Sequence, residues 1–201
     1  MKTFLAGLVL EGRRCAVIGD DAEVLAKASK LALAGARVEV YECAPAGPVA
    51  QALGGLAGVS VQRAPFSLDA PGGPFRVVML APGDPARAAA LFADCEARGV
   101  LFCAIDQPES CSLSNLATAE FGVISMGFAS GGQSPGLLRR LRDGLAAGLA
   151  EPVGAFSLAM AKLRAETPRG SRREVLDAAL RGFEVRVTVT LPSWFRAGGS
   201  R

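Results

Sequence analysis

The sequence predicts an α/β fold, in which a mostly parallel sheet comes first and a smaller helical part follows. Between residues 15 and 105, short apolar runs alternate with segments whose apolar residues recur at helical spacing. The first run, residues 16–18, ends at Gly19, and the next, residues 38–41, ends at Glu42. Such alternation is typical of parallel strands that are joined by crossover helices.

The turn after the first strand bears on cofactor binding. Residues 15–42 have the layout of a dinucleotide-binding βαβ unit, so the predicted sheet is Rossmann-like. The phosphate turn of such a unit reads G-x-G-x-x-G, but its glycine positions here hold Gly19, Asp21 and Val24, with Asp20 between. A carboxylate repels a pyrophosphate and takes the space that a phosphate needs at the helix N-terminus. The alternative is that Asp20 or Asp21 simply caps the helix.

Further strands and helices continue the alternation as far as Asp106. At most a short helix is predicted after Glu42, and a weak strand near Val59. Proline is favoured at the first position of a helix, and Pro85 precedes an apolar stripe. The later elements are a strand over residues 75–80, a helix over residues 85–98 and a strand over residues 101–105.

The second part of the chain begins with a change of composition. Residues 107–121 are polar and irregular, and a strand is predicted over residues 122–128. Ser134 is a good N-cap before a proline, so a helix is expected directly after it. The remaining predicted elements are helices from Pro135, from Pro152 and over residues 172–180, and a strand-like tail over residues 183–190.

Composition narrows the class of protein and its partners. The chain has 201 residues and a net charge of +3, which is too small to indicate nucleic-acid binding. Charged residues interrupt every long apolar segment, so we expect no membrane span, and the N-terminal segment is interpreted as a domain start rather than a signal peptide. The 5 cysteines form no C-x-x-C pair, and buried, reduced thiols of a cytoplasmic protein are expected.

The chain contains no histidine, so acid–base chemistry falls mainly to carboxylates, and no metal ligands are predicted. Ligands of an open α/β sheet bind beyond the C-terminal ends of its strands, where Asp106 is the best candidate for proton transfer. The alternative for Asp106 is a loop aspartate that caps local backbone N–H groups. Residues 130–134 are Ser-Gly-Gly-Gln-Ser, which suits either an anion-holding turn or an ordinary turn before a solvated basic helix face.

Several motifs together resemble a known family. They are LEGRRCAVIG, KASKLALAGARVEV, FCAIDQP and, most specifically, FASGGQSPGLLRRLRDGL. They are similar to the precorrin-2 dehydrogenase/sirohydrochlorin ferrochelatase family, the N-terminal module of siroheme synthases. The resemblance covers the chain from its N-terminal part to about residue 165.

The resemblance implies a cytoplasmic homodimer that oxidises precorrin-2 to sirohydrochlorin with NAD, and that in bifunctional members also inserts ferrous iron. It implies a Rossmann-like NAD-binding-type domain at residues 1–110. A dimerisation and tetrapyrrole-cleft region would follow at residues 111–150, and a helical unit with a strand-like tail at residues 151–201. The expected partner is a tetrapyrrole, and neither nucleic acid nor membrane is expected.

The same resemblance assigns roles to individual residues. Asp106 would be the catalytic base and the acceptor of pyrrole protons. The expected cofactor-binding residues are Gly19, Asp20, Asp21, Ala22, Glu42, Ala81 and Asp84. The expected substrate-binding residues are Ser130, Gly131, Gly132, Ser134 and Arg139, with Arg140 and Arg142 as further basic candidates.

The chain departs from the family pattern at three surfaces. The family usually has three glycines at positions 19–21, an Ala-Thr-Asp-Asp stretch at positions 81–84, and Phe-x-x-Pro at positions 113–116. Two other functions therefore remain open. One is a redox-inactive member that acts as a chelatase or sirohydrochlorin carrier, and the other is a non-enzymatic dimeric scaffold for a tetrapyrrole enzyme.

Overall fold

Five parallel strands form one sheet in the order β3-β2-β1-β4-β5. The chain builds outward from β1 in one direction and then, from β4 on, in the other, which opens a crevice at the C-terminal ends of these strands. The strands are β1 (Arg14–Ile18), β2 (Arg37–Tyr41), β3 (Val59–Val61), β4 (Val77–Leu80) and β5 (Leu101–Ala104). The predicted Rossmann-like sheet is therefore confirmed in this computed structural model, which describes residues 3–195.

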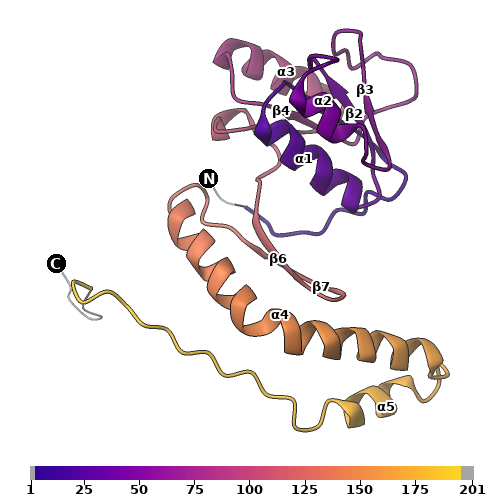
Figure 1. Ribbon diagram of the computed structural model, residues 1–201, viewed down its shortest axis with the longest axis vertical. Helices are drawn as coiled ribbons and strands as arrows, with labels where there is room; N and C mark the ends of the chain where they lie inside the picture. The colour runs from indigo at the N-terminus through magenta and orange to yellow at the C-terminus, as the bar shows by residue number, and fades with distance from the viewer. Residues whose placement is uncertain (1–2, 196–201) are drawn as a thin grey trace. The chain divides into compact units, whose positions relative to one another are not determined.

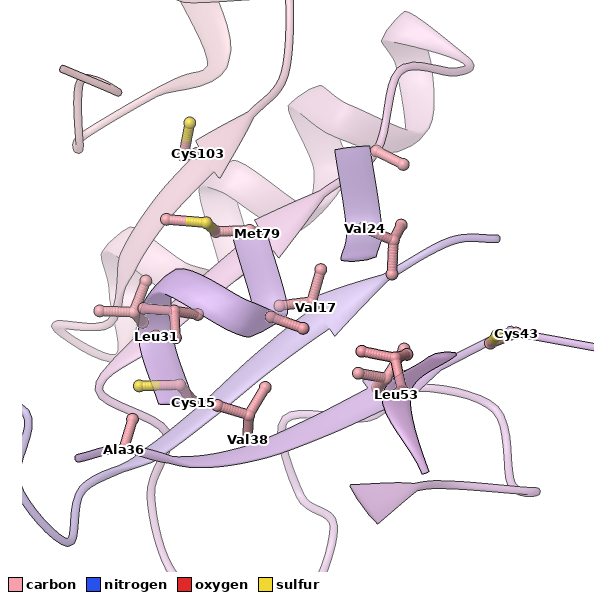
Figure 2. Close-up of a cluster of buried hydrophobic side chains, with 14 of the residues drawn as sticks. Cys15, Val17, Val24, Leu31, Ala36, Val38, Cys43, Leu53, Met79 and Cys103 are labelled. Carbon is pink, nitrogen blue, oxygen red and sulfur yellow. The ribbon is translucent and has the colours of Figure 1, made fainter. Parts of the chain in front are cut away.

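Helices cover both faces of the sheet (Figure 1). Side chains of α1 (Ala22–Leu33) and α2 (Pro48–Leu53) pack on one face, and those of α3 (Pro85–Ala97) pack on the other. Successive residues of a strand point to opposite faces, so β1 contributes side chains to the hydrophobic cores on both faces of the sheet. All five of its residues are buried. Figure 2 shows the first of these cores, with Val17 of β1 beside Val24 of α1.

A partly buried ion pair joins the first residue of β1 to the middle of β2. The Arg14 guanidinium donates from Nε to Glu39 Oε1 at 2.6 Å and from Nη2 to Glu39 Oε2 at 2.8 Å. The Tyr41 hydroxyl donates to the same carboxylate at 2.6 Å, and Arg14 Nη1 donates to the carbonyl oxygens of Ala70 and Gly73. Hydrogen bonds from Arg14 therefore hold the pKa of Glu39 below its usual value, although burial acts in the opposite direction.

A hairpin follows the sheet, where the sequence predicted only its second strand. Strands β6 (Ala117–Phe121) and β7 (Ile124–Phe128) pair with each other. The expectation that residues 107–121 are irregular is wrong for β6. Its buried residues, Ala119 and Phe121, alternate with Thr118 and Glu120, which is the pattern of a half-buried strand, but the segment is short and Phe121 is its one large apolar residue.

Helix α4 is longer than expected. It runs without interruption over Pro135–Glu166, so the predicted start at Pro135 is confirmed and the predicted separate helix from Pro152 is wrong. A proline inside a helix removes one backbone hydrogen bond, but its own φ is helical. The apolar stripe continues on both sides of Pro152, and the helix passes through it.

Helix α4 also bears on the expected absence of a membrane span. By length and composition alone, it is apolar enough to cross a membrane, and 11% of its most apolar window is buried. Between Gly144 and Ala161 the only charged residue is Glu151, so a single charge interrupts the apolar segment of this helix. The same composition also occurs in helices of soluble proteins, and it assigns no membrane partner.

The chain divides into two compact units, and this division cuts α4. The first contains the described residues up to 119 and residues 126–144, and the second contains residues 120–125 and the described residues from 145 on. In the second unit, Ser157 Oγ accepts from the Val123 N–H at 3.1 Å and donates to the Phe121 carbonyl at 2.9 Å, which fixes the hairpin tip on α4. The three-part functional division of the chain stays a prediction.

The last described segment follows α5 (Arg172–Ala179), which agrees with the helix predicted over residues 172–180. Residues 183–190 alternate in polarity as predicted, but they form no strand ladder with any described part of the chain. The predicted strand is therefore wrong as secondary structure, because an alternating pattern becomes a strand only with a hydrogen-bonding partner. Its apolar side chains, such as Val187 and Val189, are more than half exposed.

Candidate functional site

Asp106 lies two residues after the end of β5, and its backbone is unusual. Its φ of 63° is in the left-handed region, which among described residues other than glycine is shared only with Glu42, at 60°. Both residues follow the C-terminal end of a strand, and aspartate adopts this conformation more readily than most residues. Backbone strain of this kind is frequent at functional sites, where it sets the direction of a side chain.

Asp106 lines a cavity of about 420 Å³ that lies entirely within the first unit. This volume is within the range of small-molecule sites. The cavity brings Asp106 together with the predicted Ser130-Gly131-Gly132 turn, which lies between β7 and α4. The remaining lining residues are Cys103, Ala104, Ile105, Gln107, Pro108, Cys111, Leu113, Ser114, Asn115, Phe128, Ala129, Pro135 and Leu138.

The Ser130 turn is held mainly by its own hydrogen bonds. Ser130 Oγ accepts from the Ser134 N–H at 3.0 Å, and the Ser130 carbonyl accepts from the Gln133 N–H at 3.2 Å. Two of the N–H groups predicted to hold an anion are therefore used inside the turn. Gly131 and Gly132 both have left-handed φ values, 61° and 84°, which explains the two glycines.

The predicted basic residues are on the first turns of α4 but do not line the cavity. Arg139 and Arg140 are exposed on the helix surface. Arg142 donates to its neighbour Asp143 at 2.7 Å, an exposed pair that contributes little to stability. Ser134 precedes α4 and is half-buried. The assignment of Ser134 and Arg139 to substrate binding stays a prediction.

The phosphate turn keeps its first glycine, Gly19, and two carboxylates, Asp20 and Asp21, follow it. Gly19 has a φ of 132°, and a Cβ on it would lie 2.6 Å from the Ala81 side chain, so only glycine fits. Asp21 caps α1, because its side chain accepts from the Val24 N–H at 2.9 Å. Asp20 accepts from the Ala44 N–H and from the Cys43 thiol, both at 3.1 Å.

These contacts test whether the turn suits a dinucleotide. A pyrophosphate binds to free N–H groups at a helix N-terminus, where the dipole favours a negative charge. Here Asp21 already uses one such N–H group and supplies the negative charge, and a second carboxylate lies beside it. The residues present do not fit a pyrophosphate, and the alternative interpretation of Asp21 as a helix cap is confirmed.

The other predicted cofactor residues surround this turn. Glu42 follows β2 and forms an ion pair with Arg87 of α3 at 2.5 Å. Asp84 caps α3 by accepting from the Ala86 N–H at 3.0 Å. Ala22 is the first residue of α1. Ala81 is buried, and its N–H donates to the Ile18 carbonyl at 2.9 Å. Their roles in cofactor binding stay predictions.

Sequence reasoning missed two features of the cavity. Gln107 Nε2 donates to the Gly83 carbonyl at 2.9 Å, while its Oε1 is buried without a hydrogen-bond partner. Cys103 and Cys111 face each other across an isolated antiparallel bridge. The sequence shows that the two cysteines are eight residues apart and that Asp106 lies between them. It does not predict that the chain turns back there. Within residues 3–195, no three His, Cys, Asp or Glu side chains gather as a metal site.

Comparisons with known proteins show similarity to a putative NAD(P)-binding family and to siroheme synthases. A family described as putative NAD(P)-binding matches residues 7–117. The siroheme synthase of Gluconacetobacter diazotrophicus is 31% identical over 160 residues, which cover 78% of this chain and 33% of that protein. The siroheme synthase of Chromobacterium violaceum is 32% identical over 144 residues, which cover 71% of this chain and 30% of that protein. The chain thus spans about a third of the length of these relatives.

A solved structure supports the fold over nearly the whole chain. SirC, a precorrin-2 dehydrogenase, superposes with a TM-score of 0.68 over 90% of each chain, at 17% sequence identity. At that identity, the likeness shows the fold alone.

Proposed function

Because the chain belongs to a family described as putative NAD(P)-binding and is similar to siroheme synthases, we propose that it acts on a precorrin-2- or sirohydrochlorin-type tetrapyrrole in the Asp106 cavity. The observation that carries the proposal is the meeting of Asp106 with the Ser130-Gly131-Gly132 turn in one cavity. Asp106 comes from the FCAIDQP motif and the turn comes from the FASGGQSPGLLRRLRDGL motif, and Asp106 and Ser130 lie 24 positions apart in the sequence.

Asp106 is the proton acceptor of the proposed reaction. Insertion of Fe²⁺ into sirohydrochlorin releases two pyrrole protons, and a carboxylate beside the ring edge can accept them one after the other and pass each to solvent. Asp106 is exposed to the cavity, and the chain has no histidine to compete for this role. The left-handed backbone directs the carboxylate without requiring a second side chain to hold it.

The phosphate turn supports one of the two reactions of the family over the other. NAD⁺, where it binds, accepts the hydride in the oxidation of precorrin-2. Since Asp20 and Asp21 do not fit its pyrophosphate, we propose iron insertion, or transfer of sirohydrochlorin to a partner enzyme, as the function of this chain.

NAD-dependent oxidation of precorrin-2 is the second candidate. Two observations favour it: the match to a putative NAD(P)-binding family, and the turn at Gly19, which retains the close approach to Ala81. The proposal also includes a cytoplasmic homodimer, in which residues 111–150 contribute to dimerisation and to the tetrapyrrole cleft.

The test uses the purified full chain under anaerobic conditions, with two assays run side by side. One follows formation of siroheme from sirohydrochlorin and Fe²⁺, and the other follows sirohydrochlorin absorbance from precorrin-2 with and without NAD⁺. We expect iron insertion above the uncatalysed rate and no NAD⁺-dependent oxidation.

Oxidation that depends on NAD⁺ would favour the second candidate. Tetrapyrrole binding without either reaction would indicate the carrier role. Failure to bind either tetrapyrrole, in protein shown to be folded by circular dichroism, would overturn the proposed function and favour the scaffold.

A further inference from the structure

Five thiols are free in the structure, but only two of them face each other. Cys103 lies in β5, at the end of the core shown in Figure 2, and Cys111 follows the 3₁₀ turn Pro108–Ser110. The chain reverses between them, so that Cys111 lies opposite Cys103 on the free edge of β5. Figure 2 shows the Cys103 sulfur beyond Met79, away from the centre of the cluster.

The hydrogen bonds around this bridge define its geometry. The Ser112 N–H donates to the Phe102 carbonyl at 2.9 Å, and the Phe102 N–H donates to Ser112 Oγ at 3.0 Å. Cys103 and Cys111 therefore form the kind of antiparallel pair that is not directly hydrogen-bonded, in which the Cα atoms lie about 4.5 Å apart and the side chains are close. That separation is within the range of about 4.4–6.8 Å that a disulfide spans.

We propose that Cys103 and Cys111 form a reversible disulfide in the wall of the Asp106 cavity, made by exchange with a low-molecular-weight disulfide such as oxidised glutathione. The cavity supplies the access that this reaction needs, because both cysteines line it and Cys111 is only half-buried.

Exchange takes place in two balanced steps. The Cys111 thiolate attacks one sulfur of oxidised glutathione, forms a mixed disulfide and releases one glutathione thiolate. The Cys103 thiol loses its proton to solvent and attacks the Cys111 sulfur, which releases the second glutathione. The protein thus loses two electrons and two protons, and one glutathione disulfide becomes two thiols.

The remaining cysteines differ in environment from this pair. Burial raises the pKa of Cys15 and Cys95 to about 11, and burial together with Asp20 raises that of Cys43 to about 11. The hydrogen bond from Cys103 lowers the pKa of Cys111 to about 7, while burial acts in the opposite direction. Since the thiolate is the attacking form, Cys111 is the thiol expected to react first.

Oxidation also changes the support of Asp106. In the reduced chain, the Cys111 sulfur lies 3.3 Å from the carbonyl oxygens of both Ala104 and Gln107, which share its single thiol proton. These carbonyls flank the turn that carries Asp106, and a disulfide has no proton to donate. If the proposed function holds, the oxidised chain will have lower activity than the reduced one.

The experiment measures the disulfide without any tetrapyrrole. The full chain is incubated in buffers of graded reduced-to-oxidised glutathione ratio, quenched with acid, denatured, alkylated with N-ethylmaleimide and digested with trypsin. Cys103 and Cys111 fall in one tryptic peptide, residues 99–139, which a second cleavage after Glu109 divides between them. We expect this peptide to lose two hydrogens and to escape alkylation, with its halves linked until dithiothreitol is added, while the other cysteines are alkylated.

Two variants sharpen the result. In Cys103→Ser, glutathione should remain attached to Cys111, because no second thiol is present to displace it. In Cys95→Ser, a matched change of a buried cysteine on α3, the linked peptide should form as in the native chain.

The proposal is overturned if both thiols of the native chain are alkylated at every ratio, if stable glutathione stays on native Cys111, or if the linked peptide joins two chains on a non-reducing gel. These outcomes are independent of the proposed function. A disulfide that forms without changing the rate of iron insertion would instead refute only the consequence for Asp106.

Discussion

The side-chain amide of Gln107 donates to the carbonyl oxygen of Gly83 at 2.9 Å, and this bond joins the loop after β5 to the loop after β4. Gln107 is the neighbour of Asp106, and Gly83 precedes the residue that caps α3. One hydrogen bond therefore connects the proposed catalytic loop with the loop on the nucleotide side of the sheet. The other polar atom of this side chain, Oε1, is buried without a hydrogen-bond partner, so the side chain does not extend the contact into a larger network.

Replacing Gln107 by Leu should lower the rate of iron insertion and change the stability of the fold little. The variant loses one hydrogen bond, worth about 1 kcal/mol, but it also removes a buried unpartnered oxygen, so the two effects on unfolding oppose each other. We expect the unfolding midpoint to change little and kcat to fall. A matched change, Gln62→Leu at the far end of the sheet, serves as the control. Equal losses of rate in the two variants would contradict the role of Gln107.

Replacing Asp106 by Asn should abolish the proton transfer and keep the fold. Asparagine adopts the left-handed backbone as readily as aspartate, so we expect no loss of stability and a fall in rate of about 100-fold or more. Asp69→Asn, which changes an exposed carboxylate paired with Arg98, is the control. Full activity of the Asp106 variant would show that the proton acceptor has been assigned to the wrong residue.

The regular alternation of apolar strands with amphipathic helices made the sheet predictable, and the errors lie where this pattern is weak. Strand β1 is apolar on both faces and ends at a glycine, so its place and that of α1 followed directly from the sequence. Strand β6 was missed because it alternates over only five residues, of which Phe121 is the one large apolar residue. Helix α4 was divided at Pro152 because the sequence does not reveal whether a proline ends a helix or lies inside it.

The places of the candidate site residues along the chain were predictable, but their arrangement in space was not. The position of Asp106 after a strand, and that of Ser130 before a helix, could be read from local patterns. Their presence in one cavity depends on the return of the chain through β6 and β7. The pairing of Cys103 with Cys111 likewise depends on a tertiary contact that no local pattern encodes.

The carboxylates of the phosphate turn can be exchanged for the residues that a dinucleotide prefers. We expect the double variant Asp20→Gly/Asp21→Gly to bind NAD⁺ at least tenfold more tightly than the native chain, measured by titration calorimetry, since it removes two negative charges and opens the helix N-terminus. Loss of the cap itself costs only a few tenths of a kcal/mol when glycine replaces aspartate.

The matched variant Asp20→Asn/Asp21→Asn separates charge from shape. It keeps side chains that cap a helix but removes both charges, so an equal gain in affinity would assign the obstacle to charge. Native chain that binds NAD⁺ as tightly as either variant would show that the turn accommodates a pyrophosphate after all.

The Glu39 carboxylate should make the fold less stable in acid. Its pKa is lowered in the folded state by hydrogen bonds from Arg14, so its contribution is present above the ordinary value of 4.5 and is lost as the pH falls through the folded pKa. Thermal unfolding at a series of pH values should therefore show a decline below about pH 4.5, and Glu39→Gln should flatten it. Glu96→Gln, an exposed carboxylate on α3, is the control and should leave the decline unchanged.

The hairpin tip of the second unit should not tolerate a side chain at Gly122. A Cβ there would collide with Ser157 Oγ and lie 2.5 Å from the Gly154 carbonyl, and its φ of 64° is left-handed. We expect Gly122→Ala to destabilise the fold by about 2–4 kcal/mol, as judged by urea unfolding. Gly148→Ala on α4, where a Cβ meets no atom within 4 Å, should instead stabilise it by about 0.5–1 kcal/mol. A destabilised Gly148 variant would contradict this account of α4.

The left-handed backbone at Asp106 also limits which substitutions a lineage of such proteins can explore. Asparagine and glycine keep the loop and discard the carboxylate, whereas glutamate keeps the charge but is less suited to this conformation. Exchange of the acid for a longer one would require the loop to be rebuilt at the same time. Loss of the reaction is therefore a smaller evolutionary step than its relocation, and a chain of this fold can become a pure binding protein through one change.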